Sequence, residues 1–399
     1  MKFHRNYKFR LYPTKSQEEL LDLHFFLSNQ AWNSTLAQKI EDISKNKDLP
    51  KANRKFRKDK EIENAMKEEL KARGFKPHTG VIQESFKSMK KALEKFYDGK
   101  YDGVGFPKFK DSKGIEQSFY FKNQGISWTE SYFKILKNKI SWKLHRNIPS
   151  SAKLNGVVVK RESDGKFYVI LNLTFEEEIQ DHPSNAECAL DLNVENIAIS
   201  DSNGNRKLIK LEDFSKSKYS KNFLKLQRKL SKRYKEKNFS KNTKRLQKKS
   251  NRMYKKIKNK KEDFFHKLSH QLTNQYDQIS IEKLEIKKMK ESKSNRLNRL
   301  ISDVSWNSLI QKIKYKQELK NGQIRELNPA FSSQRCNKCG HISKNNRKTQ
   351  SVFHCENCGY TTNADLNASD NLLDYDNWSL EQMTLIQQWN QNLCIENVS

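Results

Sequence analysis

The sequence predicts a multidomain α+β protein, and three observations lead to that fold class. The chain has 399 residues, which is enough for about two to four domains with cores of their own. Apolar side chains occupy every second position of residues 167–175, as in a strand with one buried face. In residues 82–96 they return every three or four positions, as on one face of a helix.

The composition indicates a polyanionic partner. The formal net charge is +31, from 78 Lys and Arg against 47 Asp and Glu. So large an excess repels itself unless a polyanion is present, and nucleic acid is the obvious candidate. A membrane partner is disfavoured because the sequence shows no long apolar span and no lipidation signal. The segment MKFHRNYKFRLYP has no signal-peptide core, so we expect a cytoplasmic protein, associated with the nucleoid in a prokaryote.

The N-terminal half is predicted to be a small β-domain interrupted by helices. Residues 1–13 form a first strand, and residues 116–183 are rich in strand patterns. Residues 14–115 are predicted to be helical, including the polar and basic stretch 44–73. A small barrel or sandwich fits this order, with the N-terminal strand completing it and the helical region as an insertion.

A different pattern of predicted strands and helices begins at residue 184. Three short strands are predicted at 188–191, 197–200 and 207–211. A block at 215–261 then holds 21 Lys and Arg against one acid and keeps the apolar spacing of a helical pair. A strand at 278–284 and a helix at about 303–319 follow. This order predicts an RNase H-like fold, in which acids on the first strand, the fourth strand and a late helix meet at one point.

Two Cys-x-x-Cys pairs are the strongest local signal. Cys336 and Cys339 form the first pair, Cys355 and Cys358 form the second, and each pair is followed by a glycine that permits a tight turn. Four thiolates in two such turns favour tetrahedral coordination of one structural Zn²⁺ over disulfides in a reducing compartment. The nearby residues that this site does not need are His341, His354 and the lone thiols Cys188 and Cys394.

Three acids lie where the predicted fold would bring carboxylates together. Asp191 lies inside the apolar run Cys188–Leu192, Glu282 in the later strand, and Asp365 just beyond the second cysteine pair. A buried carboxylate needs a cation, and the alternative to a metal ion is one of the many lysines. Oxygen ligands suit Mg²⁺ or Mn²⁺, and two such ions about 4 Å apart can hydrolyse a phosphodiester.

These residues lie in segments that resemble one known family. ALDLNVENIAI and ISIEKLEIKKM resemble the first and second RuvC motifs of the TnpB (OrfB) proteins encoded by transposable elements. SDVSWNSLIQKIKYK, NPAFSSQRCNKCGHI, HCENCGY and NADLNASDNLL resemble the helix, the zinc ribbon and the third RuvC motif, in the family's order. FRLYPTKSQEELL, GVIQESFKSMKKALEKFYDG and GFPKFK resemble the N-terminal segments, so the resemblance covers nearly the whole chain.

The resemblance implies an RNA-guided DNA endonuclease related to the type V CRISPR effectors. Such a protein binds a guide RNA from the transposon end, recognises a short transposon-adjacent motif and cleaves complementary double-stranded DNA with one RuvC site, with one protomer for each guide RNA. Carried onto this sequence, the Mg²⁺ ligands are Asp191, Glu282 and Asp365, and the Zn²⁺ ligands are the four paired cysteines.

The implied domains follow from the same motifs. They are a wedge β-barrel (1–13 and 116–183), a helical recognition lobe (14–115), a RuvC nuclease domain (184–329 and 361–378, with the basic insertion 215–261), an inserted zinc ribbon (330–360) and a C-terminal tail (379–399). Nucleic-acid contacts are expected at Lys76, Gln83, Lys87, Lys244, Arg245, Lys248, Lys249 and Arg252.

Two departures from the family pattern leave alternatives open. Asn193 replaces the usual glycine after the first acid, and Asn363-Ala364 replaces an acid and an arginine before the third. The main alternative is therefore a catalytically weak or inactive relative that acts as an RNA-guided DNA-binding repressor. A RuvC-type nuclease acting on structured DNA without a guide is a second alternative, and a zinc-ribbon transcription factor leaves the three acids unexplained.

Overall fold

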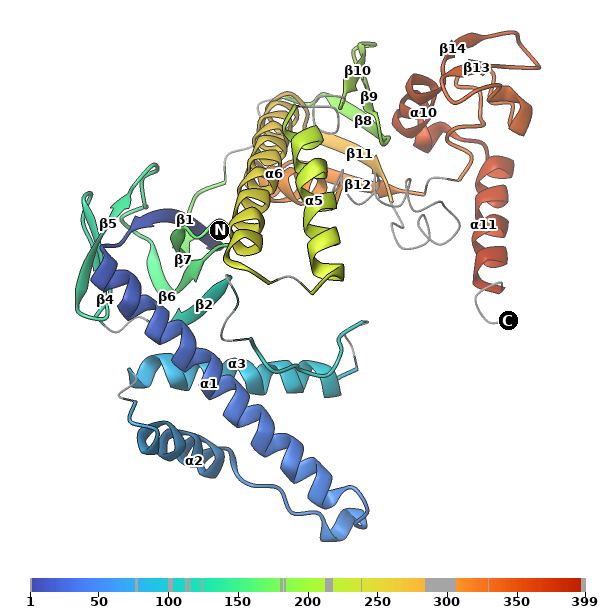
Figure 1. The fold of residues 1–399 in the computed structure, drawn as a ribbon. Coiled ribbons are helices and arrows are strands. Elements are labelled where there is room, and N and C mark those ends of the chain that lie inside the picture. The colour runs from blue at the N-terminus through green and yellow to red at the C-terminus, as the bar shows by residue number, and fades with distance from the viewer. Residues whose placement is uncertain are drawn as a thin grey trace. The chain divides into compact units, whose positions relative to one another are not determined.

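The chain divides into two compact units, Met1–Glu178 and Ile179–Ser399, each with a sheet and helices of its own (Figure 1). The computed structural model describes most of both units. The described residues are 2–75, 78–99, 103–111, 114, 116–122, 125–179, 182, 184–211, 218–237, 239–283, 306–328 and 330–395.

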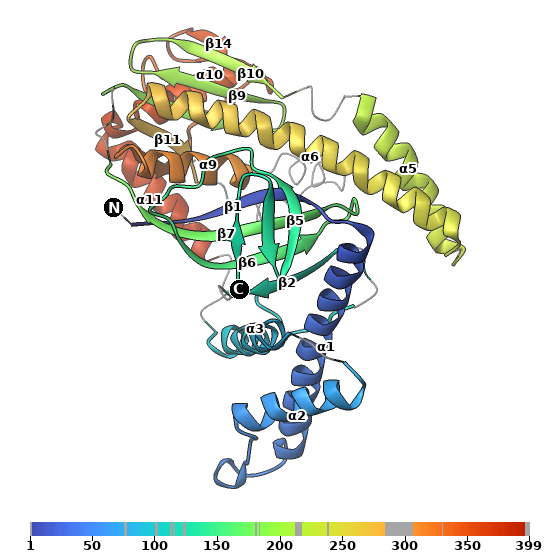
Figure 2. The same cartoon turned by 90° about the vertical axis from the view of Figure 1, so that its left-hand side faces the viewer.

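The first unit contains a seven-stranded antiparallel sheet. Its strands are β1 (Lys2–Tyr12), β2 (Gln117–Phe121), β3 (Ser127–Trp128), β4 (Tyr132–Ile135), β5 (Asn138–Lys143), β6 (Lys153–Arg161) and β7 (Phe167–Glu176), in the order β2-β6-β7-β1-β5-β4-β3. The N-terminal strand β1 pairs with β7 on one side and with β5 on the other, which confirms the prediction that it completes this sheet. The sheet curls, and one face buries Phe9, Val169 and Leu171 (Figure 2).

Three helices follow β1: α1 (Lys15–Asn46), α2 (Asp59–Ala72) and α3 (Thr79–Tyr97). Thr14 and Gln17 form a capping box at the start of α1, which satisfies backbone N–H groups that the first turn leaves free. Leu27, Met66 and Phe86 bring the three helices into one apolar cluster. The prediction that 44–73 is helical throughout was wrong, because residues 47–58 hold only the 3₁₀ turn Lys51–Asn53.

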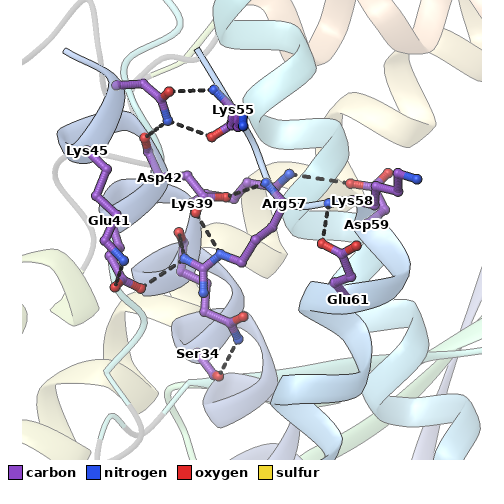
Figure 3. A network of polar contacts seen from close by, with 12 residues as sticks. Ser34, Lys39, Glu41, Asp42, Lys45, Lys55, Arg57, Lys58, Asp59 and Glu61 are labelled. Atoms are coloured by element: carbon purple, nitrogen blue, oxygen red, sulfur yellow. Dashed lines mark hydrogen bonds and ion pairs between the residues drawn. The ribbon is translucent and has the colours of Figure 1, made fainter. Parts of the chain in front are cut away.

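Side-chain and backbone hydrogen bonds hold this non-helical segment against α1 (Figure 3). Asn46 accepts a hydrogen bond from the backbone N–H of Lys55 (2.7 Å) and donates one to its carbonyl oxygen (2.8 Å). The Arg57 guanidinium donates to Asp42 (2.6 Å) and to Glu41 (2.9 Å). Because these contacts take the place of helical hydrogen bonds, the chain can leave α1 and begin α2 in a defined direction.

The second unit contains a five-stranded mixed sheet. Its strands are β8 (Glu187–Leu192), β9 (Asn196–Asp201), β10 (Arg206–Lys210), β11 (Gln278–Glu282) and β12 (Gln323–Leu327), in the order β10-β9-β8-β11-β12. The first three are antiparallel, whereas β11 runs parallel to both β8 and β12. The four predicted strands are confirmed, but β10 ends at Lys210 and β11 at Glu282, before the predicted ends. Residue Leu284 of the last predicted strand lies outside the described residues.

Helices cover both faces of this sheet. On one face, α6 (Lys241–Gln275) and α9 (Trp306–Glu318) pack on the sheet through Phe265, Leu268, Trp306 and Ile313. On the other face, α10 (Ala364–Leu373) packs through Leu372. The sheet therefore lies between two helical layers, and a polar side chain on the α10 face is separated from the larger apolar core.

The remaining elements extend from this three-layer body. Helix α5 (Lys218–Lys235) lies beside the N-terminal part of α6, which confirms the predicted basic helical pair (Figure 1). Strands β13 (Val352–His354) and β14 (Thr361–Asn363) form a small hairpin before α10, and α11 (Leu380–Ile395) ends the described chain. Within the described ranges, every helix is too short or too polar to cross a lipid bilayer.

Candidate metal centres

The alternation of β8 explains how Asp191 can lie in an apolar run. Leu190 and Leu192 point into the core under α6 and α9, whereas Ala189 and Asp191 point toward the face that α10 covers. Asp191 is buried, with 6% of its surface exposed. The apolar neighbours in sequence are therefore on the opposite side of the sheet from the carboxylate.

The second and third acids reach the same face from distant segments. Ile281 of β11 is paired with Leu190 of β8 in parallel register, so the next residue, Glu282, lies beside Asp191. Asp365 is in the first turn of α10 and is as buried as Asp191. Both Glu282 and Asp365 interact electrostatically with Asp191. The structure thus places the three acids predicted from the sequence on one face of the sheet, near enough to interact electrostatically.

Each carboxylate receives a hydrogen bond from a neighbouring side chain. The Asn193 amide donates to Asp191 (2.7 Å), the Ser332 hydroxyl to Glu282 (2.9 Å) and the Asn196 amide to Asp365 (2.9 Å). Asn363 caps α10 by accepting from the backbone N–H of Asp365 (3.0 Å). These donors fix the orientation of the three carboxylates without neutralising their charge.

Arg347 is a site residue that sequence reasoning missed. It follows the 3₁₀ turn Lys344–Asn346, and its guanidinium lies 3.4 Å from the carboxylate of Asp365. Its charge also acts on Asp191 and Glu282. A single arginine in a chain with 78 basic residues gives no sequence signal, although its position between the cysteine pairs could have suggested a role near Asp365.

The environment raises the pKa of two of these carboxyl groups. Burial raises the pKa of Asp191 well above its ordinary value, the charge of Glu282 adds to the rise, and the hydrogen bond from Asn193 opposes it. Burial likewise raises the pKa of Glu282, against the effects of Ser332 and Arg347. Clustered carboxylates of this kind favour a divalent cation as their partner.

The donor set fits a hard cation. Carboxylates from three segments lie on one face of the sheet, and Asn196, whose amide nitrogen bonds Asp365, has a buried Oδ1 atom without a hydrogen-bond partner. In the described part of the chain, however, only the four cysteines have ligand atoms that all lie within 4.8 Å of one another. The carboxylates would have to approach each other, or share more than one ion, to complete a site.

The four cysteines form a compact site in the small hairpin region. The Sγ atoms of Cys336 and Cys358 are 3.7 Å apart, and those of Cys339 and Cys355 are 3.6 Å apart. A zinc ion with Zn–S bonds of about 2.3 Å in tetrahedral geometry requires sulfur atoms about 3.8 Å apart, so this arrangement fits Zn²⁺. Gly340 and Gly359 have φ of +73° and +72°, which is why a glycine ends each turn.

The predicted nucleic-acid residues have varied surroundings. Lys244, Arg245, Lys248, Lys249 and Arg252 are all exposed on α6. In the first unit, the Gln83 amide donates to Glu63 (3.0 Å) and Lys87 is paired with Glu84 (3.0 Å). Lys76 lies outside the described residues. These five residues of α6, here called its basic face, are therefore exposed to solvent, whereas Gln83 and Lys87 already have protein partners.

Comparisons with known proteins match three separate parts of the chain. Three family models match: "Helix-turn-helix domain" over residues 1–48, "Probable transposase" over 171–293 and "Cas12f1-like, TNB domain" over 306–372. The first description differs from the structure, where residues 2–46 contain the strand β1 and the single helix α1. The third covers α9, the cysteine site and most of α10.

Curated relatives and a solved structure agree with these matches. The "Putative RNA-guided DNA endonuclease InsQ" of Escherichia coli is 30% identical over 73% of this chain and 73% of its own length. The "Putative RNA-guided DNA endonuclease" of Streptomyces pristinaespiralis is 23% identical over 73% of this chain and 70% of its own. Cas12f1, in a complex with single-guide RNA and target DNA, has a similar fold, with a TM-score of 0.55 over 90% of this chain and 83% of that chain, at 17% identity.

The family matches and the similar fold therefore define a class, the transposon-encoded relatives of the type V effectors. The chain belongs to the TnpB (OrfB) family.

Proposed function

We propose that the protein is an RNA-guided DNA endonuclease that cleaves double-stranded DNA complementary to a transposon-derived guide RNA. The observation that carries this proposal is the convergence of Asp191, Glu282 and Asp365 on one face of the mixed sheet. The names of the two curated relatives support it, since both are described as RNA-guided DNA endonucleases.

The proposal assigns a role to each part of the chain. Residues 184–329 and 361–378 are the RuvC domain of RNase H-like fold, and residues 330–360 are its zinc ribbon. Residues 1–13 and 116–183 are the wedge, residues 14–115 are the recognition lobe, and the role of 379–399 is not assigned. The protein acts as one protomer for each guide RNA, in the cytoplasm or on the nucleoid. The antiparallel β8–β9–β10 with β11 parallel to β8 supports the RuvC assignment.

The chain's own residues would hold and orient the reacting groups. Two Mg²⁺ or Mn²⁺ ions, when bound, would supply an activated water and stabilise the leaving 3′-oxygen. Asp191, Glu282 and Asp365 would hold these ions, and the donors Asn193 and Ser332 would keep the first two carboxylates oriented. Arg347, which lies 3.4 Å from Asp365, would bind the phosphate being cleaved, because a guanidinium binds carboxylate and phosphate alike.

Cleavage of plasmid DNA tests the proposal. The protein is purified with its bound RNA, the RNA is sequenced, and plasmids with matching and mismatched targets are offered in Mg²⁺. We expect only the matching plasmid to be cut. We expect Asp191→Ala, Glu282→Ala and Asp365→Ala to abolish cutting while RNA and target binding survive, because each removes a metal ligand without changing the basic surface.

The same experiment separates the alternatives. A wild-type protein that binds the matching plasmid without cutting it would support the guided repressor instead. Cutting that does not depend on a bound RNA would support a nuclease for structured DNA. An alanine variant at any of the three acids that still cuts in Mg²⁺ would contradict the assignment of the site.

The basic face of α6 is proposed to contact nucleic-acid phosphates. Three of its exposed residues, Lys244, Lys248 and Lys249, would be changed together to Gln. The slope of log affinity against log salt should flatten by about 2 to 3, since each lost phosphate contact removes about 0.7 to 0.9. The control changes Lys45, Lys67 and Lys90, which are already paired with acids, to Gln. An equal slope in the two triple variants would refute the contact.

We propose that residues at the start of α3 recognise the short transposon-adjacent motif in the target DNA. The Gln83 amide could bond an adenine bidentately if it left Glu63, with Lys76 and Lys87 near phosphates. Gln83→Ala should then relax the preferred motif in a library of target plasmids, whereas Glu63→Ala should leave it unchanged or sharpen it. An unchanged motif in Gln83→Ala would contradict this role.

A further inference from the structure

Helix α10, which carries Asp365, is bound to the first cysteine turn by two fully buried asparagines. Asn367 donates to the carbonyl oxygen of Arg335 (2.8 Å) and accepts from the backbone N–H of Asn337 (3.3 Å). Asn371 donates to the carbonyl oxygens of Arg335 (2.7 Å) and Ser332 (2.8 Å). Arg335 and Asn337 flank Cys336 in the sequence, so these amides hold the backbone on both sides of a zinc ligand.

The start of α10 is also part of the core of the cysteine site. Ala364, which precedes Asp365, is buried in one cluster with Cys336, Cys355 and Phe353. Its backbone N–H donates to the carbonyl oxygen of Ser351 (3.0 Å), and Asn363 is paired with Val352 in the small hairpin. The alanine in the Asn363-Ala364 departure thus fills a space inside the cysteine site.

The segment around the cysteine site also contacts the other acids. Ser332 donates to Glu282, and its carbonyl oxygen accepts from Asn371, so one residue joins a carboxylate to α10. Arg347 lies between the two cysteine pairs and reaches Asp365. A change in the fold of the cysteine turns would therefore move a partner of Glu282, a partner of Asp365 and the helix that carries Asp365.

We propose that Asn367 and Asn371 are positioning residues that couple the two metal centres, so that zinc at the cysteines and divalent cations at the carboxylates strengthen each other's binding. The inference rests on the proposed function, because it requires a cation at the carboxylates. The reason is that zinc holds the turn, the two amides hold α10 to the turn, and α10 holds Asp365. Coupling of this kind is reciprocal, so it can be measured from either metal.

Zinc affinity of the wild-type protein is the first measurement. The protein is equilibrated with zinc concentrations buffered by the zinc-selective chelator TPEN, with and without saturating Mg²⁺, and bound zinc is measured once it no longer changes. We expect Mg²⁺ to lower the apparent dissociation constant of zinc by about fivefold or more, which is the usual lower range of coupling between sites. In Asp191→Asn, which lacks a Mg²⁺ ligand but keeps every residue of the cysteine site, this difference should disappear.

Binding of Mn²⁺, followed by electron paramagnetic resonance, is the second measurement. Asn367→Ala and Asn371→Ala should keep one zinc per chain at low temperature but bind Mn²⁺ at least about tenfold more weakly than the wild type. The matched control is Asn377→Ala, because Asn377 is exposed and its amide bonds only the adjacent turn at Asp374 in the described structure. This variant should bind Mn²⁺ as the wild type does.

The outcomes separate the inference from the function on which it rests. A wild-type protein that binds Mn²⁺ but has the same dissociation constant for zinc with and without Mg²⁺ overturns the coupling alone. Unchanged Mn²⁺ affinity in both asparagine variants, with zinc retained, also overturns it. A wild-type protein with no Mn²⁺ site overturns the proposed function and the coupling together.

Discussion

The cysteine site and the carboxylate site differ in how the chain assembles them. The four cysteines come from two short turns of one small hairpin region, and their sulfur atoms already lie at the spacing that zinc requires. The three acids come from β8, β11 and α10, and each is held by a donor such as Asn193 or Ser332. The cysteine site therefore has all its ligands in one short segment, whereas the carboxylate site keeps negative charge in excess and draws its ligands from distant segments.

Loss of a zinc ligand is expected to have the largest effect. Cys355→Ser should abolish stoichiometric zinc and unfold the region around the turns, because structural zinc contributes on the order of 10 kcal/mol to such a fold. Zinc content by mass spectrometry and resistance to trypsin measure the two effects. His354→Ala is the control, since His354 contacts Thr361 beside the site. Zinc loss in the control equal to that in Cys355→Ser would contradict a four-cysteine site.

Loss of a carboxylate should raise the free energy of unfolding, whereas loss of a zinc ligand should lower it. Asp191→Asn keeps the shape of the side chain but removes a buried charge that lies near Glu282 and Asp365. In buffer without Mg²⁺ or Mn²⁺, with zinc left bound at the cysteines, we expect the free energy of unfolding to rise by on the order of 1 kcal/mol, because burying like charges is unfavourable. Urea denaturation measures it. A clear loss of stability would show that the acid is satisfied by the protein alone, and the contrast between the two sites would fail.

A variant of Arg347 tests whether this residue, which lies between the two cysteine pairs, takes part in cleavage at the carboxylate site. Arg347→Gln should slow single-turnover cleavage about 10- to 100-fold, because a positive charge near the reacting phosphate is lost. Zinc content should not change, since Arg347 contacts Asp365 and the carbonyl oxygen of Gln350 rather than a cysteine. Arg347→Lys should recover part of the rate. Unchanged cleavage in Arg347→Gln would show that this arginine has no part in the reaction and only balances the charge of the carboxylates in the metal-free protein.

Asn193 is expected to have the smallest effect. Asn193→Gly restores the residue usual in the family and removes the 2.7 Å hydrogen bond to Asp191. One such bond contributes about 1 kcal/mol, so cleavage and Mg²⁺ affinity should change by about fivefold or less. A titration of cleavage rate against Mg²⁺ concentration measures both. A change of a hundredfold would make Asn193 part of the reacting site instead of a support for Asp191.

Much of the fold could be predicted from local patterns. Alternation in β7, helical spacing in α3 and α6 and the spacing of the cysteines each have one dominant physical interpretation. The non-helical segment 47–58 was missed, because it depends on the contacts of Asn46 and Asp42 with residues that are nine to fifteen positions away. Propensity cannot show that a side chain far along the chain will replace helical hydrogen bonds.

The candidate site was predictable only in part for a related reason. Asp191, Glu282 and Asp365 could be placed together because the order of strands and helices fixes where strand ends and a helix start meet. Asn196, Ser332 and Arg347 are polar residues among many, and nothing local distinguishes them. Their contacts depend on the register of β9 and on the path of the chain around the cysteine turns.

The pair α5 and α6 has a practical consequence for making shorter variants. Only the C-terminal third of α6, around Phe265 and Leu268, packs into the core under the sheet, and α5 packs mainly on α6. The pair could therefore be trimmed from its tip by equal whole turns in both helices, with a new connecting loop, and leave that core closed. A graded set of such truncations would yield compact proteins for delivery, in which chain length and the number of positive charges decrease together.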